Sequence, residues 1–257
     1  MRNPMQLADR HVLVTGGAQG IGLAIAELAL ELGARVSLVD ANGDALALAT
    51  GRLDPERVQA FAGSVTDRSF VADAVAQASA RFGPVSGLVN NAGIVRPAMI
   101  HKMTAGQWQD VLDVNLTGAF NCLQAVGSAL IALAKEGRAT PAAVVNISAD
   151  AGRKGTIGQI NYGAAKSGML SLTMSAALEW ARYGIRVNTL CFGVVETAMT
   201  ETIRSEKFRD TYLARIPLGR WATPAEVAQP VCFLLSEASS YVTGQNLSVN
   251  GGAFMTA

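Results

Sequence analysis

The chain has 257 residues, half of them apolar and 16% charged, so its length allows one large α/β domain or two small ones with an extensive core. The net charge of +1 gives no basic bias toward nucleic acid, and three widely spaced cysteines form neither a disulfide framework nor a metal-ligand pattern. The first residues lack the apolar core of a signal peptide, and no uninterrupted apolar run reaches the ~18 residues of a membrane helix. We therefore expect a cytoplasmic protein with reduced thiols, no metal site and no membrane partner.

Apolar, β-branched runs alternate along the chain with longer Ala/Leu-rich stretches of helical spacing. The predicted strands cover residues 11–15, 35–40, 58–62, 86–90, 142–148, 185–190 and 246–249. The predicted helices cover residues 20–33, 66–82, 104–134 and 159–183. Continuous apolar strands separated by helices indicate a parallel sheet that is covered on both faces. The pattern predicts a single doubly wound, Rossmann-type α/β domain over residues 1–257, with seven parallel strands.

An irregular, charged segment at 193–222 follows the sixth predicted strand. Ligands of doubly wound sheets bind at the carboxyl ends of the strands. We therefore expect residues 193–222 to form a substrate-binding loop region.

The sequence TGGAQGIG at residues 15–22 joins the first predicted strand to the first helix. Glycines at 16, 20 and 22 allow a sharp turn and a close approach to a pyrophosphate, which the N–H groups at the start of the helix would bind. No Gly-Lys-Ser/Thr follows, so the turn is not a P-loop. An ordinary tight turn is the alternative.

Asp40 ends the second predicted strand, 24 residues after Gly16. A carboxylate at this place accepts hydrogen bonds from the adenosine ribose and repels a 2′-phosphate. Neither Ala41 nor Gln19 supplies the cation that a 2′-phosphate needs. The pattern favours NAD over NADP, and a solvated aspartate at a strand end is the alternative.

Tyr162 and Lys166 lie four residues apart in a predicted helix and therefore share a face. A phenol titrates near ~10, and a neighbouring ammonium is expected to lower that pKa toward working pH. The pair is a candidate acid/base unit. A surface Tyr and Lys on one helix face is the alternative.

Taken together, these motifs and four others resemble the short-chain dehydrogenase/reductase family, closest to 3-oxoacyl-carrier-protein reductases. The resemblance covers nearly the whole chain, and its further motifs are NNAG (90–93), DVNLTG (113–118), NISADAG (146–152) and RVNTLCFG (186–193). It implies that Tyr162 is the general acid/base, that Lys166 binds the nicotinamide ribose, and that Asn115 holds a water in a proton relay. The implied cofactor contacts are Gly16, Gln19, Gly20, Ile21, Gly22, Asp40, Val65, Asn90, Asn91, Gly93, Tyr162, Lys166, Gly193, Val195 and Thr197.

The chain departs from the family pattern at the usual catalytic serine. Counting back from Gly152 or from Tyr162 places Ala149 there, with Ser148 one position earlier. Either Ser148 or another hydroxyl or a water would polarise the substrate carbonyl; Ser148 is retained as a candidate catalytic residue. Phe192 stands where the family usually has a proline before Gly193.

The resemblance implies hydride transfer between NAD(H) and a secondary alcohol or ketone, such as a polyol, a hydroxyacyl thioester or a steroid. Candidate pocket residues are Arg96, Arg153, Lys154, Glu196, Met199 and Trp221. Arg153 and Lys154 would hold an anionic substrate group, unless they are solvated loop charges.

Three alternative functions remain open beside the predicted hydride transfer, and an assembly state is also predicted. The chain would otherwise be a 3-oxoacyl-carrier-protein reductase, a non-catalytic NAD(H)-binding sensor because of Ala149, or a scaffold on a dehydrogenase fold. The resemblance also implies a homotetramer built on the paired helices at 104–134 and 159–183.

Overall fold

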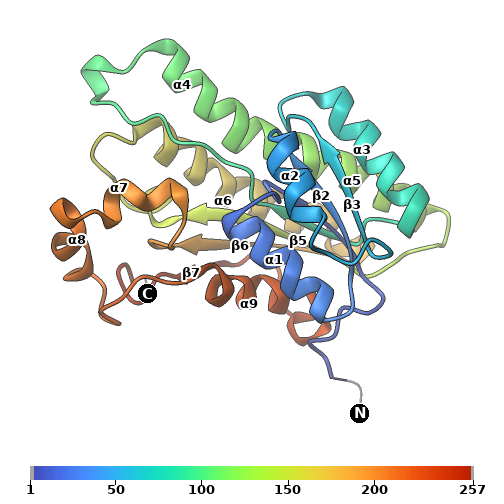
Figure 1. Cartoon of the computed structure of the whole chain (residues 1–257). Coiled ribbons are helices and arrows are strands. Elements are labelled where there is room, and N and C mark those ends of the chain that lie inside the picture. Colours follow the sequence, from blue (N-terminus) through green and yellow to red (C-terminus); the bar gives the residue numbers. More distant parts are fainter. Residues whose placement is uncertain (1–2, 256–257) are drawn as a thin grey trace.

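The computed structural model describes residues 3–255, which form a seven-stranded sheet in the order β3-β2-β1-β4-β5-β6-β7 (Figure 1). All neighbouring strands pair in parallel. The strands are β1 (His11–Thr15), β2 (Arg35–Asp40), β3 (Val58–Ala62), β4 (Gly87–Asn90), β5 (Ala142–Ala149), β6 (Ile185–Phe192) and β7 (Asn246–Val249). The predicted doubly wound fold is confirmed, and each strand agrees with its predicted range to within two residues at either end.

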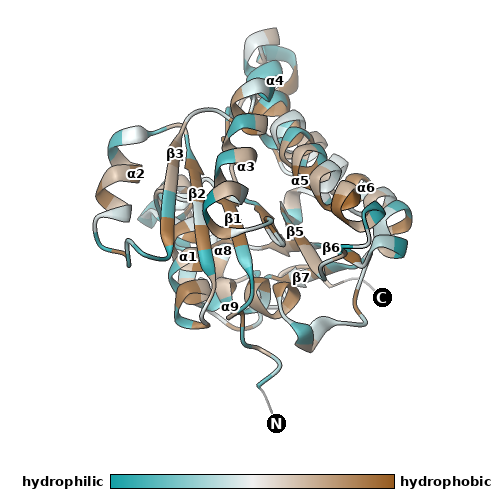
Figure 2. Ribbon diagram, turned by 90° about the vertical axis from the view of Figure 1, so that its right-hand side faces the viewer, coloured by the Kyte–Doolittle hydropathy of each residue, from teal (hydrophilic) through white to brown (hydrophobic). Residues whose placement is uncertain are grey.

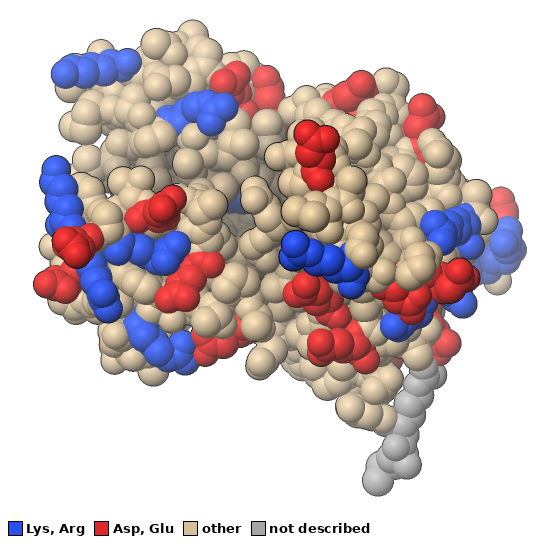
Figure 3. All heavy atoms as spheres, in the orientation of Figure 1, with Lys and Arg blue, Asp and Glu red and all other residues tan. Residues whose placement is uncertain are grey.

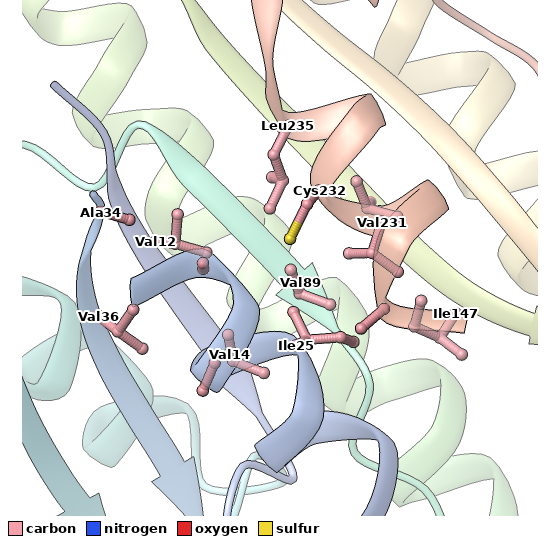
Figure 4. Close-up of a cluster of buried hydrophobic side chains, with 14 of the residues drawn as sticks. Val12, Val14, Ile25, Ala34, Val36, Val89, Ile147, Val231, Cys232 and Leu235 are labelled. Atoms are coloured by element: carbon pink, nitrogen blue, oxygen red, sulfur yellow. The ribbon is translucent and has the colours of Figure 1, made fainter. Parts of the chain in front are cut away.

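One face of the sheet is covered by α1 (Gly20–Glu31), α2 (Gly43–Thr50) and α9 (Pro224–Leu235). Figure 4 shows this core, in which Ile25 of α1 lies near Val14 of β1, and Val231 of α9 lies near Ile147 of β5. Every residue of β1 is buried, as expected for a central strand with helices on both faces.

The other face is covered by α3 (Arg68–Phe82), α5 (Gly118–Lys135) and α6 (Ile160–Trp180). Figure 2 shows apolar strands enclosed between these two helical layers. The strand order reverses between the neighbouring strands β1 and β4. The chain therefore leaves the carboxyl ends of β1 and β4 toward opposite halves of the sheet, which leaves a crevice at these ends.

The predicted helix at 104–134 is one continuous stretch with an internal irregularity. It comprises α4 (Ala105–Leu112), a π-helical turn (Asp113–Thr117) and α5. Contrary to the expectation from sequence, the stretch Ala105–Lys135 is long and apolar enough to cross a membrane. However, α5 packs against β4, β5, α3 and α6, so it is a core helix of this fold.

The expectation of an irregular loop at 193–222 is only partly correct. The segment contains two short helices, α7 (Glu201–Arg204) and α8 (Glu206–Leu213). They project beside the carboxyl ends of β5 and β6, where a substrate-binding region was expected (Figure 1).

Candidate active site

A cleft of about 420 Å³ opens at the carboxyl ends of β1, β2, β4, β5 and β6. The face drawn in Figure 3 is hollowed near its centre, beside the start of α1. Most of the predicted site residues line this cleft: Gly16, Gln19, Gly20, Ile21, Asp40, Val65, Asn91, Gly93, Ser148, Tyr162, Lys166, Gly193, Val195 and Thr197.

The glycine turn is shaped for a phosphate group. Gly16 and Gly20 have φ angles of 64° and 57°, which L-residues with side chains rarely adopt. A Cβ on Gly22 would lie 2.0 Å from the Gly16 carbonyl oxygen, so Gly22 packs beneath the turn and does not line the cleft. Gln19 provides no side-chain cap for α1, which leaves the first N–H groups of the helix available to an anion.

Asn91 holds the turn in place from the end of β4. Its Nδ2 donates to the carbonyl oxygens of Thr15 and Gly16 at 3.0 and 3.1 Å. By contrast, Asn90 points into the core, where Nδ2 donates to Asn146 Oδ1 at 2.9 Å. Asn90 is therefore outside the lining that the described residues form, which disfavours a contact between its side chain and the cofactor.

Asp40 presents a fixed carboxylate at the outer end of the cleft. Its two oxygens accept the backbone N–H groups of Ala18 at 3.0 Å and Asn42 at 2.9 Å. The neighbouring lining residues Gln19 and Ala41 carry no charge. This end of the cleft therefore offers a carboxylate that can accept hydrogen bonds from ribose hydroxyl groups.

Tyr162 and Lys166 lie at the inner end of the cleft, on one face of α6 as predicted. Lys166 Nζ lies 5.7 Å from the centre of the Tyr162 ring and donates to the Ile147 carbonyl oxygen at 2.7 Å. Lys166 is almost fully buried, whereas Tyr162 is half-buried. The ammonium is thus held by β5 within reach of the phenol and of any group bound beside it.

Burial controls the ionisation of this pair. It raises the pKa of Tyr162 to about 12 and lowers the pKa of Lys166 to about 8. This direction is opposite to the lowered Tyr162 pKa that the sequence led us to expect, because burial of the phenol disfavours its charged form. Tyr162 is therefore a neutral phenol at pH 7, the form that donates a proton.

Asn115 lies in the π-helical turn and does not line the cleft. Its side chain accepts the N–H of Ile94 at 2.7 Å and donates to the Ile94 carbonyl at 3.0 Å. A Cβ on Gly93 would meet Asn115 Oδ1 at 3.3 Å and Lys166 Nζ at 3.7 Å, so these three residues adjoin. Asn115 thus fixes the cleft wall through Ile94, and its part in a water relay stays a prediction.

Ser148 lines the cleft, but its hydroxyl is already hydrogen-bonded within the protein. Its Oγ donates to the carbonyl oxygen of Lys166 at 2.7 Å, and the residue is buried between β5 and α6. A hydroxyl whose proton is bonded to α6 cannot also polarise a carbonyl in the cleft. The candidate catalytic role of Ser148 is therefore disfavoured, and Ala149 lines the cleft where the family has its serine.

The charged pocket candidates are bonded elsewhere in the structure. Arg153 donates to Ser248 Oγ on β7 at 2.7 Å, and Lys154 lies 3.6 Å from Asp150. Arg96 pairs with Asp110 at 3.7 Å on the surface. None of the three is among the described residues that line the cleft, which disfavours the anion-binding hypothesis.

Of the other pocket candidates, Met199 lines the cleft, whereas Glu196 and Trp221 are outside the lining that the described residues form. The prediction missed a set of apolar and small lining residues, which comprises Val39, Ala41, Gly63, Ser64, Ala92, Ile94, Val114, Ile147, Ala198 and Thr200. Thr200 had a local signal, since Thr197 and Thr200 form a capping box at the start of a short helix.

A model of the family described as enoyl-(acyl carrier protein) reductase matches residues 16–253. The chain belongs to the short-chain dehydrogenase/reductase family. It is 41% identical to the 3-oxoacyl-(acyl-carrier-protein) reductase FabG of Thermotoga maritima over 251 residues, which cover 96% of this chain and 99% of that protein. It is 40% identical to the acetoacetyl-CoA reductase of Rhizobium meliloti, covering 96% of this chain and 99% of that one.

Solved structures of short-chain dehydrogenases/reductases agree with this fold. A glucose/ribitol dehydrogenase family member from Brucella melitensis has a TM-score of 0.91 at 31% identity, covering 98% of this chain and 99% of that one. A gluconate 5-dehydrogenase from Burkholderia cenocepacia, in complex with NADP and tartrate, has a TM-score of 0.90 at 33% identity and 97% coverage of both chains. The chain is therefore an oxidoreductase of this family that acts on hydroxyl or ketone groups with a nicotinamide dinucleotide.

Proposed function

We propose that the chain transfers a hydride between NAD(H) and a secondary alcohol or ketone, with Tyr162 as the general acid/base. The observation that carries the proposal is the pairing of Tyr162 and the buried Lys166 at the inner end of a cleft whose outer end holds Asp40. Because the two ends are connected by the glycine turn, one extended dinucleotide would reach from Asp40 to Tyr162.

The residues divide the chemistry among them. The nicotinamide, when bound, supplies or accepts the hydride. In reduction, the neutral Tyr162 phenol donates its proton to the carbonyl oxygen as negative charge develops there. Lys166 lies beside the phenol and stabilises the phenolate that remains. In oxidation, Tyr162 must first lose its proton, and it then removes the proton of the alcohol.

Selection of NAD rests on Asp40. A carboxylate that accepts two backbone N–H groups is held in position, so a 2′-phosphate would meet a negative group with no cation beside it. NADP is present in the structural relative from Burkholderia cenocepacia, so the preference of this chain is a separate property that kinetics must establish.

Initial rates with NAD and NADP, measured against secondary alcohols, hydroxyacyl thioesters and polyols, test the proposal. We expect turnover with NAD to exceed turnover with NADP by at least about tenfold in kcat/KM. A preference for NADP would overturn the cofactor assignment. Tight NADH binding without turnover of any substrate would instead support a sensor, the second candidate, which Ala149 favours.

The relatives favour a further alternative within the family, reduction of a 3-oxoacyl thioester. Hydroxyacyl thioesters in the panel test that alternative directly. We also propose a homotetramer in the cytoplasm. Exposed apolar side chains on the outer helices, such as Phe120 of α5 and Leu178 of α6, support contacts between subunits.

A further inference from the structure

The inner end of the cleft is walled by apolar side chains. Ile94, Ala149, Phe192 and Met199 line it, and Ala149 and Phe192 are direct partners across β5 and β6. Partners in register on neighbouring parallel strands project to the same side of the sheet. The position where a serine hydroxyl is expected is therefore a methyl group beside an aromatic ring.

Three polar side chains near this wall are already bonded within the protein. Ser148 donates to the Lys166 carbonyl, and the Asn115 side chain is bonded twice to the Ile94 backbone. The Asn161 amide donates to the carbonyls of Arg96 and Gln107 at 3.0 and 2.8 Å. The hydroxyl groups of a polyol would find no free partner among these three side chains, and each buried hydroxyl left unpaired carries a desolvation cost.

Two exposed apolar residues lie on segments that a hydrogen bond joins. The backbone N–H of Ala98 donates to the Gly158 carbonyl at 2.9 Å, which joins the segment after β4 to the loop before Tyr162. These two segments carry Ile100, 70% exposed, and Ile157, 88% exposed. Neither residue lines the cleft itself, but exposed apolar side chains on the segment that leads into Tyr162 and on its hydrogen-bonded neighbour favour an apolar ligand.

We propose that the substrate carries apolar alkyl substituents on its reacting carbon, as in an aliphatic ketone or secondary alcohol, and that polyhydroxylated substrates are rejected. The inference rests on the proposed function, because it names the substrate class of the same site. It separates this chain from the structural relatives that are named as gluconate or glucose/ribitol dehydrogenases.

A chain-length series tests the proposal. With NAD, kcat/KM rises from 2-butanol to 2-octanol by about 80-fold to 250-fold, since each of the four additional buried methylenes contributes about threefold to fourfold. Ribitol and gluconate give less than one hundredth of the 2-octanol value. Equal or higher kcat/KM with either polyol, or no rise with chain length, overturns the proposal.

A variant pair locates the effect in the cleft. Met199 lines the cleft and is 48% exposed. The variant Met199→Gln exchanges its thioether for an amide of similar length. We expect the ratio of 2-octanol to 2-butanol kcat/KM to fall about fivefold. The matched control is Met5→Gln, because Met5 is also partly buried but contacts Ser236 beyond the end of α9, away from the cleft. An equal change in both variants, or no change in Met199→Gln, contradicts the assignment.

Binding without turnover separates this inference from the proposed function. Calorimetry measures the binding of 2-octanone to the protein with NAD, and the binding of ribitol to the protein with NADH. These pairs are chosen because neither mixture can react. Binding of 2-octanone alone supports the apolar substrate class even if no alcohol is oxidised, in which case only the proposed hydride transfer fails. Binding of ribitol alone, or of neither ligand, overturns the inference.

Discussion

Restoring the missing hydroxyl at the end of β5 in Ala149→Ser is expected to accelerate reduction. Ala149 lines the cleft, and its extended backbone, with φ −148° and ψ 161°, accepts a serine without strain. Tyr162 is the hydrogen-bond donor that we assign to the reacting oxygen, so a second donor would add stabilisation as charge develops there.

The size of the gain follows from the geometry of the wall. Removing one optimised donor from an active site typically costs about 10²–10³ in kcat, which sets an upper limit for the gain. The new hydroxyl would lie beside Phe192, its partner across the sheet, in surroundings not shaped to orient it. We therefore expect kcat to rise by about tenfold, which corresponds to about 1.4 kcal/mol of transition-state stabilisation.

Steady-state reduction of 2-octanone by NADH, together with the Kd of NADH and the Tm of each variant, measures the effect. Ala164→Ser is the control, because Ala164 is exposed on the same helix as Tyr162 and outside the cleft lining. A kcat for Ala149→Ser within twofold of the unsubstituted protein, at unchanged NADH affinity and Tm, would refute the reasoning.

Three further predictions concern the cofactor, the ionisation of the site and the assembly. Asp40→Ala is expected to lower kcat/KM for NAD by about 10-fold to 100-fold, since hydrogen bonds to a charged group contribute about 1.5–3 kcal/mol. The same substitution should not lower kcat/KM for NADP. Equal losses for both cofactors in parallel assays would contradict this role. Burial raises the Tyr162 pKa to about 12, so the phenolate that alcohol oxidation needs is rare, and the logarithm of the oxidation rate should rise with pH between 6 and 9. The rate of ketone reduction should instead fall above about pH 8, where Lys166 loses its proton. Flat pH profiles in both directions would be inconsistent with these pKa values. Leu178→Glu places a charge on an α6 side chain that is 85% exposed in the single chain. Four chains of 26.8 kDa make a tetramer of about 107 kDa, and light scattering should show smaller species for this variant. A monomer before substitution would exclude the tetramer.

Local sequence patterns predicted the secondary structure well. The strands at 11–15, 35–40, 58–62 and 246–249 have the predicted bounds, because apolar β-branched runs between turns are a local signal. Helix α2 was missed because eight residues give little periodicity. Helix α9 was also missed, although Thr223 and Glu226 form a capping box ahead of it, and its internal Pro230 weakens the helical pattern.

Contacts between residues far apart in the chain were beyond prediction from one sequence. Arg153 looked available to a substrate, yet its partner Ser248 follows 95 residues later on β7. The Ser148 bond to the Lys166 carbonyl likewise depends on how closely α6 packs on β5. The upward shift of the Tyr162 pKa was missed for the same reason, since the spacing of two residues on a helix indicates that a charge is near but not how deeply the phenol is buried.

The most direct test of hydride transfer through Tyr162 is the variant Tyr162→Phe, which removes only the hydroxyl. We predict that kcat falls by at least about 10³ in both directions while the Kd of NADH changes less than twofold, because the phenol moves the proton and does not hold the adenosine end of the cofactor. Retention of more than a tenth of the activity with unchanged NADH binding would contradict the assignment of Tyr162 as the acid/base.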